Sequence, residues 1–171
     1  MNDIRQDLPE NIKNFFKRLR YYLDTDLYFY GSVMRSDYVP KQSDIDVAIF
    51  TDNEYSVMSK LQHFLHIKRS DFDKVLWKLN GTMIYGYKIK VEGINTEIAI
   101  YNNEFKDIII NDFNIPLINK TILTTVLLYL LKLFYYTIPL IPLKKYDQLK
   151  RYILNEMMVK KESVFFKIKQ T

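Results

Sequence analysis

The sequence predicts an α+β fold, in which a mixed β-sheet is flanked by helices and the C-terminal half of the chain is helical. Near the N-terminus, apolar residues recur at helical spacing after Asp7-Leu8-Pro9-Glu10, which is typical of a helix start. Between residues 74 and 101, apolar and polar residues alternate around the hairpin-turn signal Asn80-Gly81. A mixture of helices and paired strands in this order indicates an α+β protein.

Helices and strands are expected to alternate in the first half of the chain. In order, we expect a helix with Asp7 as its N-cap, a strand at Leu27–Tyr30, a short helix within Ser32–Tyr38, a strand at Asp44–Phe50, and a helix at Glu54–His66 capped by Asp52.

The second half begins with strands and continues with helices. We expect strands at Lys74–Leu79, Thr82–Val91 and Asn95–Tyr101, a long apolar helix from Asn114 to about Thr137, a basic helix at Lys144–Met158, and a last strand or frayed helix at Ser163–Lys169.

Length and charge divide the chain into two regions. Its 171 residues suit one domain, and we expect a catalytic core at residues 1–110 and a helical region packed on it at residues 111–171. The first region carries 15 basic and 16 acidic residues, and the second carries 10 and 4. A basic second region next to clustered acids favours an anionic partner. Cysteine is absent, which excludes disulfides and a thiol nucleophile.

No membrane association is expected. The apolar stretch Thr121–Leu143 contains the charged Lys132 near its middle and two prolines, so we interpret it as a buried helix. The N-terminus has no apolar signal region, which predicts a cytoplasmic or other intracellular protein. The abundance of Ile, Lys, Asn and Tyr suggests an AT-rich genome, such as that of some large DNA viruses, and thus a viral protein in a host cell.

Two motifs in the first half suggest a phosphate and metal site. Gly31-Ser32 follows a short strand, where a glycine lets a phosphate approach the backbone and Ser32 adds a hydroxyl donor. Asp44 and Asp46 stand two apart on the next strand, so their carboxylates point the same way. Such a pair repels unless a cation lies between the two groups, and Mg²⁺ prefers oxygen ligands.

A third carboxylate, Glu97, occupies a matching position on a later strand. Asp46 is followed two residues on by Ala48, and Glu97 by Ala99, which are the only alanines in the chain. We expect these small side chains to leave room for a ligand over the sheet.

These motifs together resemble the DNA polymerase beta-like nucleotidyltransferase superfamily, over about residues 27–101. Ser43-Asp44-Ile45-Asp46 is similar to the minimal nucleotidyltransferase and poly(A) polymerase-like branches, and so is the turn before Glu97. The sequence departs from the family pattern at Ser36, where a glycine is common, and at Glu97, where Asp is commoner.

The resemblance implies a nucleotidyltransferase-type sheet and a site with two Mg²⁺ or Mn²⁺ ions. The implied catalytic and metal-binding residues are Asp44, Asp46 and Glu97, and the implied nucleotide-binding residues are Gly31, Ser32, Arg35, Ser43 and Lys132. The implied reaction moves NMP from an NTP to an acceptor hydroxyl and releases pyrophosphate.

The acceptor stays open at this point. The basic region favours an RNA 3′ end, and the small size favours a partner subunit. A transferase that modifies a protein or a small molecule fits the same motifs, and so does a nucleic-acid-binding subunit that has lost activity.

Overall fold

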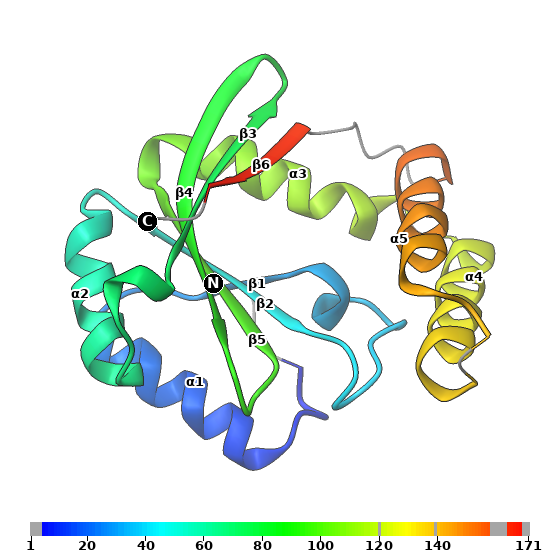
Figure 1. Cartoon of the computed structure of the whole chain (residues 1–171), viewed down its shortest axis with the longest axis horizontal. Coiled ribbons are helices and arrows are strands. Elements are labelled where there is room, and N and C mark those ends of the chain that lie inside the picture. Colours follow the sequence, from blue (N-terminus) through cyan, green and yellow to red (C-terminus); the bar gives the residue numbers. More distant parts are fainter. Residues whose placement is uncertain (1–4, 120, 139, 158–163, 169–171) are drawn as a thin grey trace.

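The computed structural model describes residues 5–119, 121–138, 140–157 and 164–168, and shows a twisted sheet with helices on both faces and a helical region to one side (Figure 1). The helices are α1 (Glu10–Leu23), α2 (Glu54–Leu65), α3 (Lys106–Ile118), α4 (Ile122–Lys132) and α5 (Leu143–Tyr152). The strands are β1 (Tyr28–Tyr30), β2 (Ile45–Thr51), β3 (Asp73–Leu79), β4 (Thr82–Val91), β5 (Thr96–Asn102) and β6 (Val164–Ile168).

The sheet has the strand order β1-β2-β5-β4-β3-β6. β2 and β5 run parallel, and the other described pairs are antiparallel. The expected turn between β3 and β4 is present, with positive φ angles at Asn80 and Gly81. The chain therefore has the predicted α+β fold with a mixed sheet.

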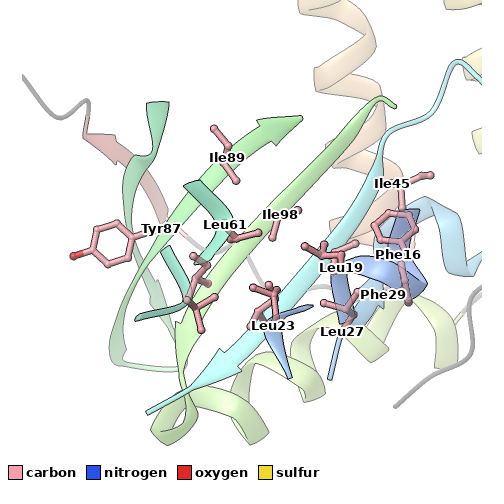
Figure 2. Close-up of a cluster of buried hydrophobic side chains, with 14 of the residues drawn as sticks. Phe16, Leu19, Leu23, Leu27, Phe29, Ile45, Leu61, Tyr87, Ile89 and Ile98 are labelled. Carbon is pink, nitrogen blue, oxygen red and sulfur yellow. The ribbon is translucent and has the colours of Figure 1, made fainter. Parts of the chain in front are cut away.

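One face of the sheet is covered by α1 and α2 (Figure 1). Figure 2 shows Leu19 and Leu23 of α1 and Leu61 of α2 packed over Ile98 of β5. The alternation of β2 places Ile45, Val47 and Ile49 in the same cluster. Burying one apolar stripe from each helix gives this face most of the core.

The other face of the sheet holds a second core under α3. Ile109 and Phe113 of α3 pack with Trp77 and Tyr101 from the sheet. The boundary predicted at residues 110/111 falls inside α3, and the division into two regions stays a prediction.

A smaller cluster forms the helical region beyond the sheet. Leu128 and Leu131 of α4 are buried against Tyr146 of α5 and Ile153. Two π-helical segments, η4 (Leu133–Thr137) and η5 (Ile153–Met157), extend α4 and α5.

Both predicted N-caps are wrong. The Asp7 side chain forms an ion pair with Arg5 at 2.7 Å, while α1 begins after Pro9 with no side-chain cap. In α2, Asn53 rather than Asp52 accepts the hydrogen bond from the Ser56 backbone N–H, at 3.0 Å. α2 begins at Glu54 as predicted, so the residue directly before it, Asn53, is the N-cap, and Asp52 lies one position too early.

The predicted helix from Asn114 to Thr137 is also wrong. Pro116 lies near the end of α3 instead of starting a helix, and α3 ends two residues later. A new helix begins after Thr121, whose hydroxyl accepts from the Thr124 backbone N–H at 3.1 Å. Proline is compatible with a helix start, which made the sequence pattern misleading here.

The C-terminal elements follow the predictions in part. The basic helix is α5, and its predicted end at Met158 lies outside the described residues. Of the two alternatives for residues 163–169, the strand is confirmed, because β6 pairs antiparallel with β3. Residues 163 and 169 themselves are not among those described.

Within the described ranges, no single helix is long and apolar enough to cross a membrane. Two helical stretches, Asn103–Ile118 and Ile122–Thr137, meet that length and composition only as a pair, and they are bent by 95°.

Replacement of the true cap of α2 should destabilise the fold measurably. We expect Asn53→Ala to lower the free energy of unfolding by about 1 kcal/mol, because the Ser56 N–H loses its acceptor. Asp52→Ala is the matched control, since Asp52 accepts an exposed hydrogen bond from the Asn103 side-chain amide, at 3.0 Å, and does not cap the helix. Urea denaturation measures both, and a larger loss for Asp52→Ala would contradict the assignment.

Candidate active site

The parallel pairing of β2 and β5 brings two of the predicted acids together. Asp46 of β2 and Glu97 of β5 are direct Cα partners in the register. Paired residues on neighbouring strands point to the same face, so the two carboxylates face the same side of the sheet. Asp44 immediately precedes β2 and is exposed.

The backbone at Gly31 passes close to the side chain of Asp46. Tyr30 pairs with Asp46 across β1 and β2, and Gly31 follows with a φ of 72°. A Cβ atom on Gly31 would lie 2.3 Å from Asp46 Oδ2. Only glycine combines this conformation with this close approach, so the chain turns directly over a carboxylate.

A pocket with a volume of about 240 Å³ opens at this point, between the sheet and the helical region. Seven of the eight residues predicted from the sequence line it: Gly31, Ser32, Arg35, Ser43, Asp44, Asp46 and Lys132. Glu97 does not line the pocket, and its carboxylate forms an ion pair with Lys88 Nζ. The other lining residues come from β1, α3, η4, α5 and η5, and are Tyr30, Phe113, Pro116, Leu117, Tyr136, Tyr146, Lys150 and Leu154.

The carboxylates of Asp46 and Glu97 repel each other. Burial first, and then the charge of Glu97, raises the pKa of Asp46 to about 7, while Lys88 and Lys150 oppose the shift. A carboxyl group with this pKa is poised to lose its proton when a cation arrives.

The donor set fits a divalent cation such as Mg²⁺. Asp44 and Asp46 offer carboxylate oxygens in the pocket, beside the backbone of Gly31. Within the described part of the chain, no three His, Cys, Asp or Glu side chains are gathered into one metal-binding group. Mg²⁺ commonly binds through one or two carboxylates and completes its shell with water and substrate phosphates, which suits this arrangement.

The expectation for the two alanines is wrong. Ala48 and Ala99 are direct partners in β2 and β5, but both are fully buried in the core under α3. Their small size makes room for the aromatic side chains of this core and not for a ligand.

A buried ion cluster, which the sequence analysis missed, forms one wall of the pocket. Asp37 is 1% exposed and accepts hydrogen bonds from Arg35 Nε at 2.7 Å and Arg35 Nη2 at 3.1 Å. Lys132 Nζ lies 3.0 Å from Asp37 Oδ2 and donates to the Asp37 carbonyl at 2.7 Å and to Ser43 Oγ at 3.1 Å. We call Arg35, Asp37, Ser43 and Lys132 the Asp37 cluster.

The charges in the Asp37 cluster hold one another in the ionised state. Burial would raise the pKa of Asp37, but the Arg35 hydrogen bond and the charges of Arg35 and Lys132 outweigh it, so the pKa is lowered. Burial lowers the pKa of Lys132, and Asp37 opposes that shift. Because an ammonium group has three protons, the three oxygen contacts occupy all the donors of Lys132. Its predicted contact with a triphosphate stays a prediction.

Lys150 is a third cation at the pocket, beside Arg35 and Lys132, and it was not among the predicted site residues. It lies on α5, is only partly exposed, and places Nζ 5.8 Å from the centre of the Tyr146 ring. Its charge lowers the pKa of Asp46, which indicates that it acts across the pocket. The sequence feature that could have identified Lys150 as a pocket residue is its spacing of four residues from Tyr146, because this spacing puts both side chains on one side of the helix.

The pocket also has an aromatic wall. Tyr30 and Phe113 stack with ring centroids 3.8 Å apart and an interplanar angle of 1°. Tyr136 lies edge-on to Tyr146. Flat apolar surfaces beside cations and carboxylates are suited to a ligand with a planar ring and an anionic tail.

The family model for the nucleotidyltransferase domain matches residues 9–115, which is more than half of the chain. The chain therefore belongs to the nucleotidyltransferase domain family, and the resemblance to polymerase beta-like nucleotidyltransferases is confirmed. No curated protein sequence matches the chain significantly.

Similar solved structures include an RNA terminal U-transferase, a poly(U) polymerase and a terminal uridylyl transferase. A cytoplasmic RNA terminal U-transferase has 16% identity and a TM-score of 0.43, over 77% of this chain and 42% of that protein. The Cid1 poly(U) polymerase has 17% identity and a TM-score of 0.36, over 61% and 34%. Terminal uridylyl transferase 4 from Trypanosoma brucei has 15% identity and a TM-score of 0.31, over 64% and 39%. The chain thus spans less than half the length of each.

Removal of the central carboxylate of the Asp37 cluster should be strongly destabilising. We expect Asp37→Ala to lower the free energy of unfolding by about 3–5 kcal/mol, because it leaves two buried cations without their counterion. Urea denaturation measures the loss, with Glu92→Ala in an exposed turn as the control.

A triple variant separates charge from packing. The combination of Arg35→Met, Asp37→Leu and Lys132→Met removes all three charges together and should recover most of the stability lost in Asp37→Ala. A loss below about 1 kcal/mol in Asp37→Ala would show that the ion cluster does not support the fold.

Proposed function

We propose that the chain is a metal-dependent nucleotidyltransferase that moves NMP from an NTP to an acceptor hydroxyl and releases pyrophosphate. The observation that carries this proposal is the pocket in which Asp44 and Asp46 face Gly31, Ser32 and Lys150. Membership of the nucleotidyltransferase domain family supports it.

Several groups in and beside the pocket have roles in the proposed reaction. The Gly31 backbone and the Ser32 hydroxyl hold the β- and γ-phosphates, and Lys150 neutralises part of their charge. The nucleobase lies against the aromatic wall, to which Tyr136 contributes. Asp44 and Asp46 would hold the Mg²⁺ ions, and Glu97 would join them once its ion pair with Lys88 is broken. When bound, the ions supply charge neutralisation for the attacking and leaving oxygens.

We propose an RNA 3′ end as the acceptor. Residues 111–171 carry ten basic and four acidic residues, and α5 exposes Lys144, Lys145 and Arg151 next to the pocket. A row of cations beside the site suits the phosphate backbone of a single strand. The solved structures do not strengthen this choice of acceptor, because their TM-scores are below 0.5.

The reaction is tested by incubating the protein with each α-labelled NTP, Mg²⁺ or Mn²⁺, and total RNA. We expect label on RNA, reduced at least about 100-fold in Asp44→Asn and Asp46→Asn, because each variant removes a carboxylate that would hold the metal ions stabilising the transition state. Asp52→Asn is the control, since this exposed acid lies at the far end of β2.

The other outcomes separate the alternatives. Label on protein or on a small molecule would replace RNA as the acceptor and keep the reaction. NTP binding by calorimetry without transfer would favour a nucleic-acid-binding subunit, or an enzyme that needs a partner subunit. No NTP binding at all would contradict the site itself.

Substitution of Lys150 should weaken nucleotide binding without destabilising the fold. We expect Lys150→Ala to weaken NTP binding about 10- to 100-fold, the usual worth of a charge-assisted hydrogen bond, with little change in melting temperature. Lys145→Ala, on the exposed side of the same helix, is the matched control and should change binding less than twofold. Calorimetry with a non-hydrolysable NTP measures both, and equal effects would reject the role of Lys150.

A further inference from the structure

The outer face of α4 exposes an unusual set of apolar side chains. Its five members are Ile122 at 86% exposed, Leu123 at 60%, Val126 at 47%, Tyr129 at 51% and Leu130 at 39%. We call these five residues the α4 outer face. α4 is apolar on its inner side as well, where Leu128 and Leu131 are buried. A helix that is apolar all round is normally covered on all sides.

The α4 outer face lies opposite the pocket. Thr124, Leu128, Leu131 and Lys132 form the buried side of α4, and Lys132 lines the pocket from there. At 100° per residue, Val126 points almost directly away from Leu128. In Figure 1, α4 stands at the edge of the molecule, with α5 beside it. A partner on this face therefore leaves the pocket accessible.

The size of the α4 outer face suits a protein interface. Together its residues expose on the order of 500 Å², which is comparable to the largest apolar patch on a typical monomer, and such patches are often functional. A standard protein interface buries roughly 800 Å² on each partner, so this face can supply the centre of one.

The charge pattern favours a second copy of the same chain as the partner. No charged residue lies between Thr121 and Leu131, whereas residues 111–171 as a whole carry a net charge of +6. Two copies would repel each other through the basic surface of α5, but not through the α4 outer face. A neutral apolar helix face is also complementary to itself across a twofold axis.

We propose that the chain forms a homodimer in which the α4 outer face packs against the same face of a second copy. The inference does not depend on the proposed reaction, because it rests on apolar surface outside the pocket.

The first test is sedimentation velocity over roughly 1–200 µM, the range in which a modest interface dissociates. We expect a reversible dimer, and at least a tenfold higher dissociation constant in the double variant Val126→Glu/Leu130→Glu. Tyr21→Glu is the control, because Tyr21 is 90% exposed on α1, away from the α4 outer face. Circular dichroism shows whether the variants are folded.

The second test uses a conservative change and the absence of cysteine from the chain. Val126→Cys introduces a single thiol at the centre of the α4 outer face, and a short bismaleimide should link two copies through it. Tyr21→Cys should give no linked dimer at the same concentration.

Three results would overturn the proposal. The first is a folded chain that stays monomeric throughout the concentration range. The second is a dimer that the double variant does not weaken and that the bismaleimide does not link through Val126→Cys. The third is a monomer that floats with phosphatidylcholine vesicles, and that no longer does so in the variant Val126→Glu/Leu130→Glu. The last result would assign the α4 outer face to a membrane surface instead.

Discussion

The buried carboxylate of Asp37 is the interaction on which the site depends. It contacts Arg35 and Lys132, and Lys132 in turn contacts Ser43, next to Asp44. Three parts of the chain therefore meet at one charge: the segment after Gly31-Ser32, the entry to β2, and the end of α4. Without this charge, two buried cations would lack a counterion, and Lys132 at the end of α4 would lose its ion pair with the segment before β2.

The Asp37 cluster also determines which charges remain for a ligand. Arg35 and Lys132 share the single negative charge of Asp37, so the Asp37 cluster keeps a net charge of +1 at the pocket wall, where it stands with the acids Asp44 and Asp46 and with Lys150. The close approach of Gly31 to Asp46 leaves no space for a side chain between the backbone and the carboxylate. The arrangement is electrostatically incomplete, since burial and Glu97 raise the pKa of Asp46 to about 7. A cation with an anionic ligand would complete it.

Local sequence patterns were sufficient to predict the strands and most of the residues that line the pocket, because the alternation of a strand and a Gly-Ser turn are short-range signals. The strand Thr82–Val91 and the placement of Asp46 on the face away from Val47 follow from a period of two. The Asp37 cluster was not predictable in this way, since Lys132 and Asp37 are 95 residues apart in the chain. The break between α3 and α4 was missed because Pro116 has the pattern of a helix start, whereas it lies near the end of α3.

The proposed reaction requires Asp44 and Asp46 to bind a divalent cation together with a nucleoside triphosphate. Electron paramagnetic resonance of Mn²⁺ tests this claim directly, by measuring free Mn²⁺ in the presence of the protein with and without a non-hydrolysable NTP. We expect the nucleotide to strengthen Mn²⁺ binding by the wild-type chain. We expect Asp46→Asn to remove this effect while the protein remains folded. Binding that is the same in both proteins would contradict the account.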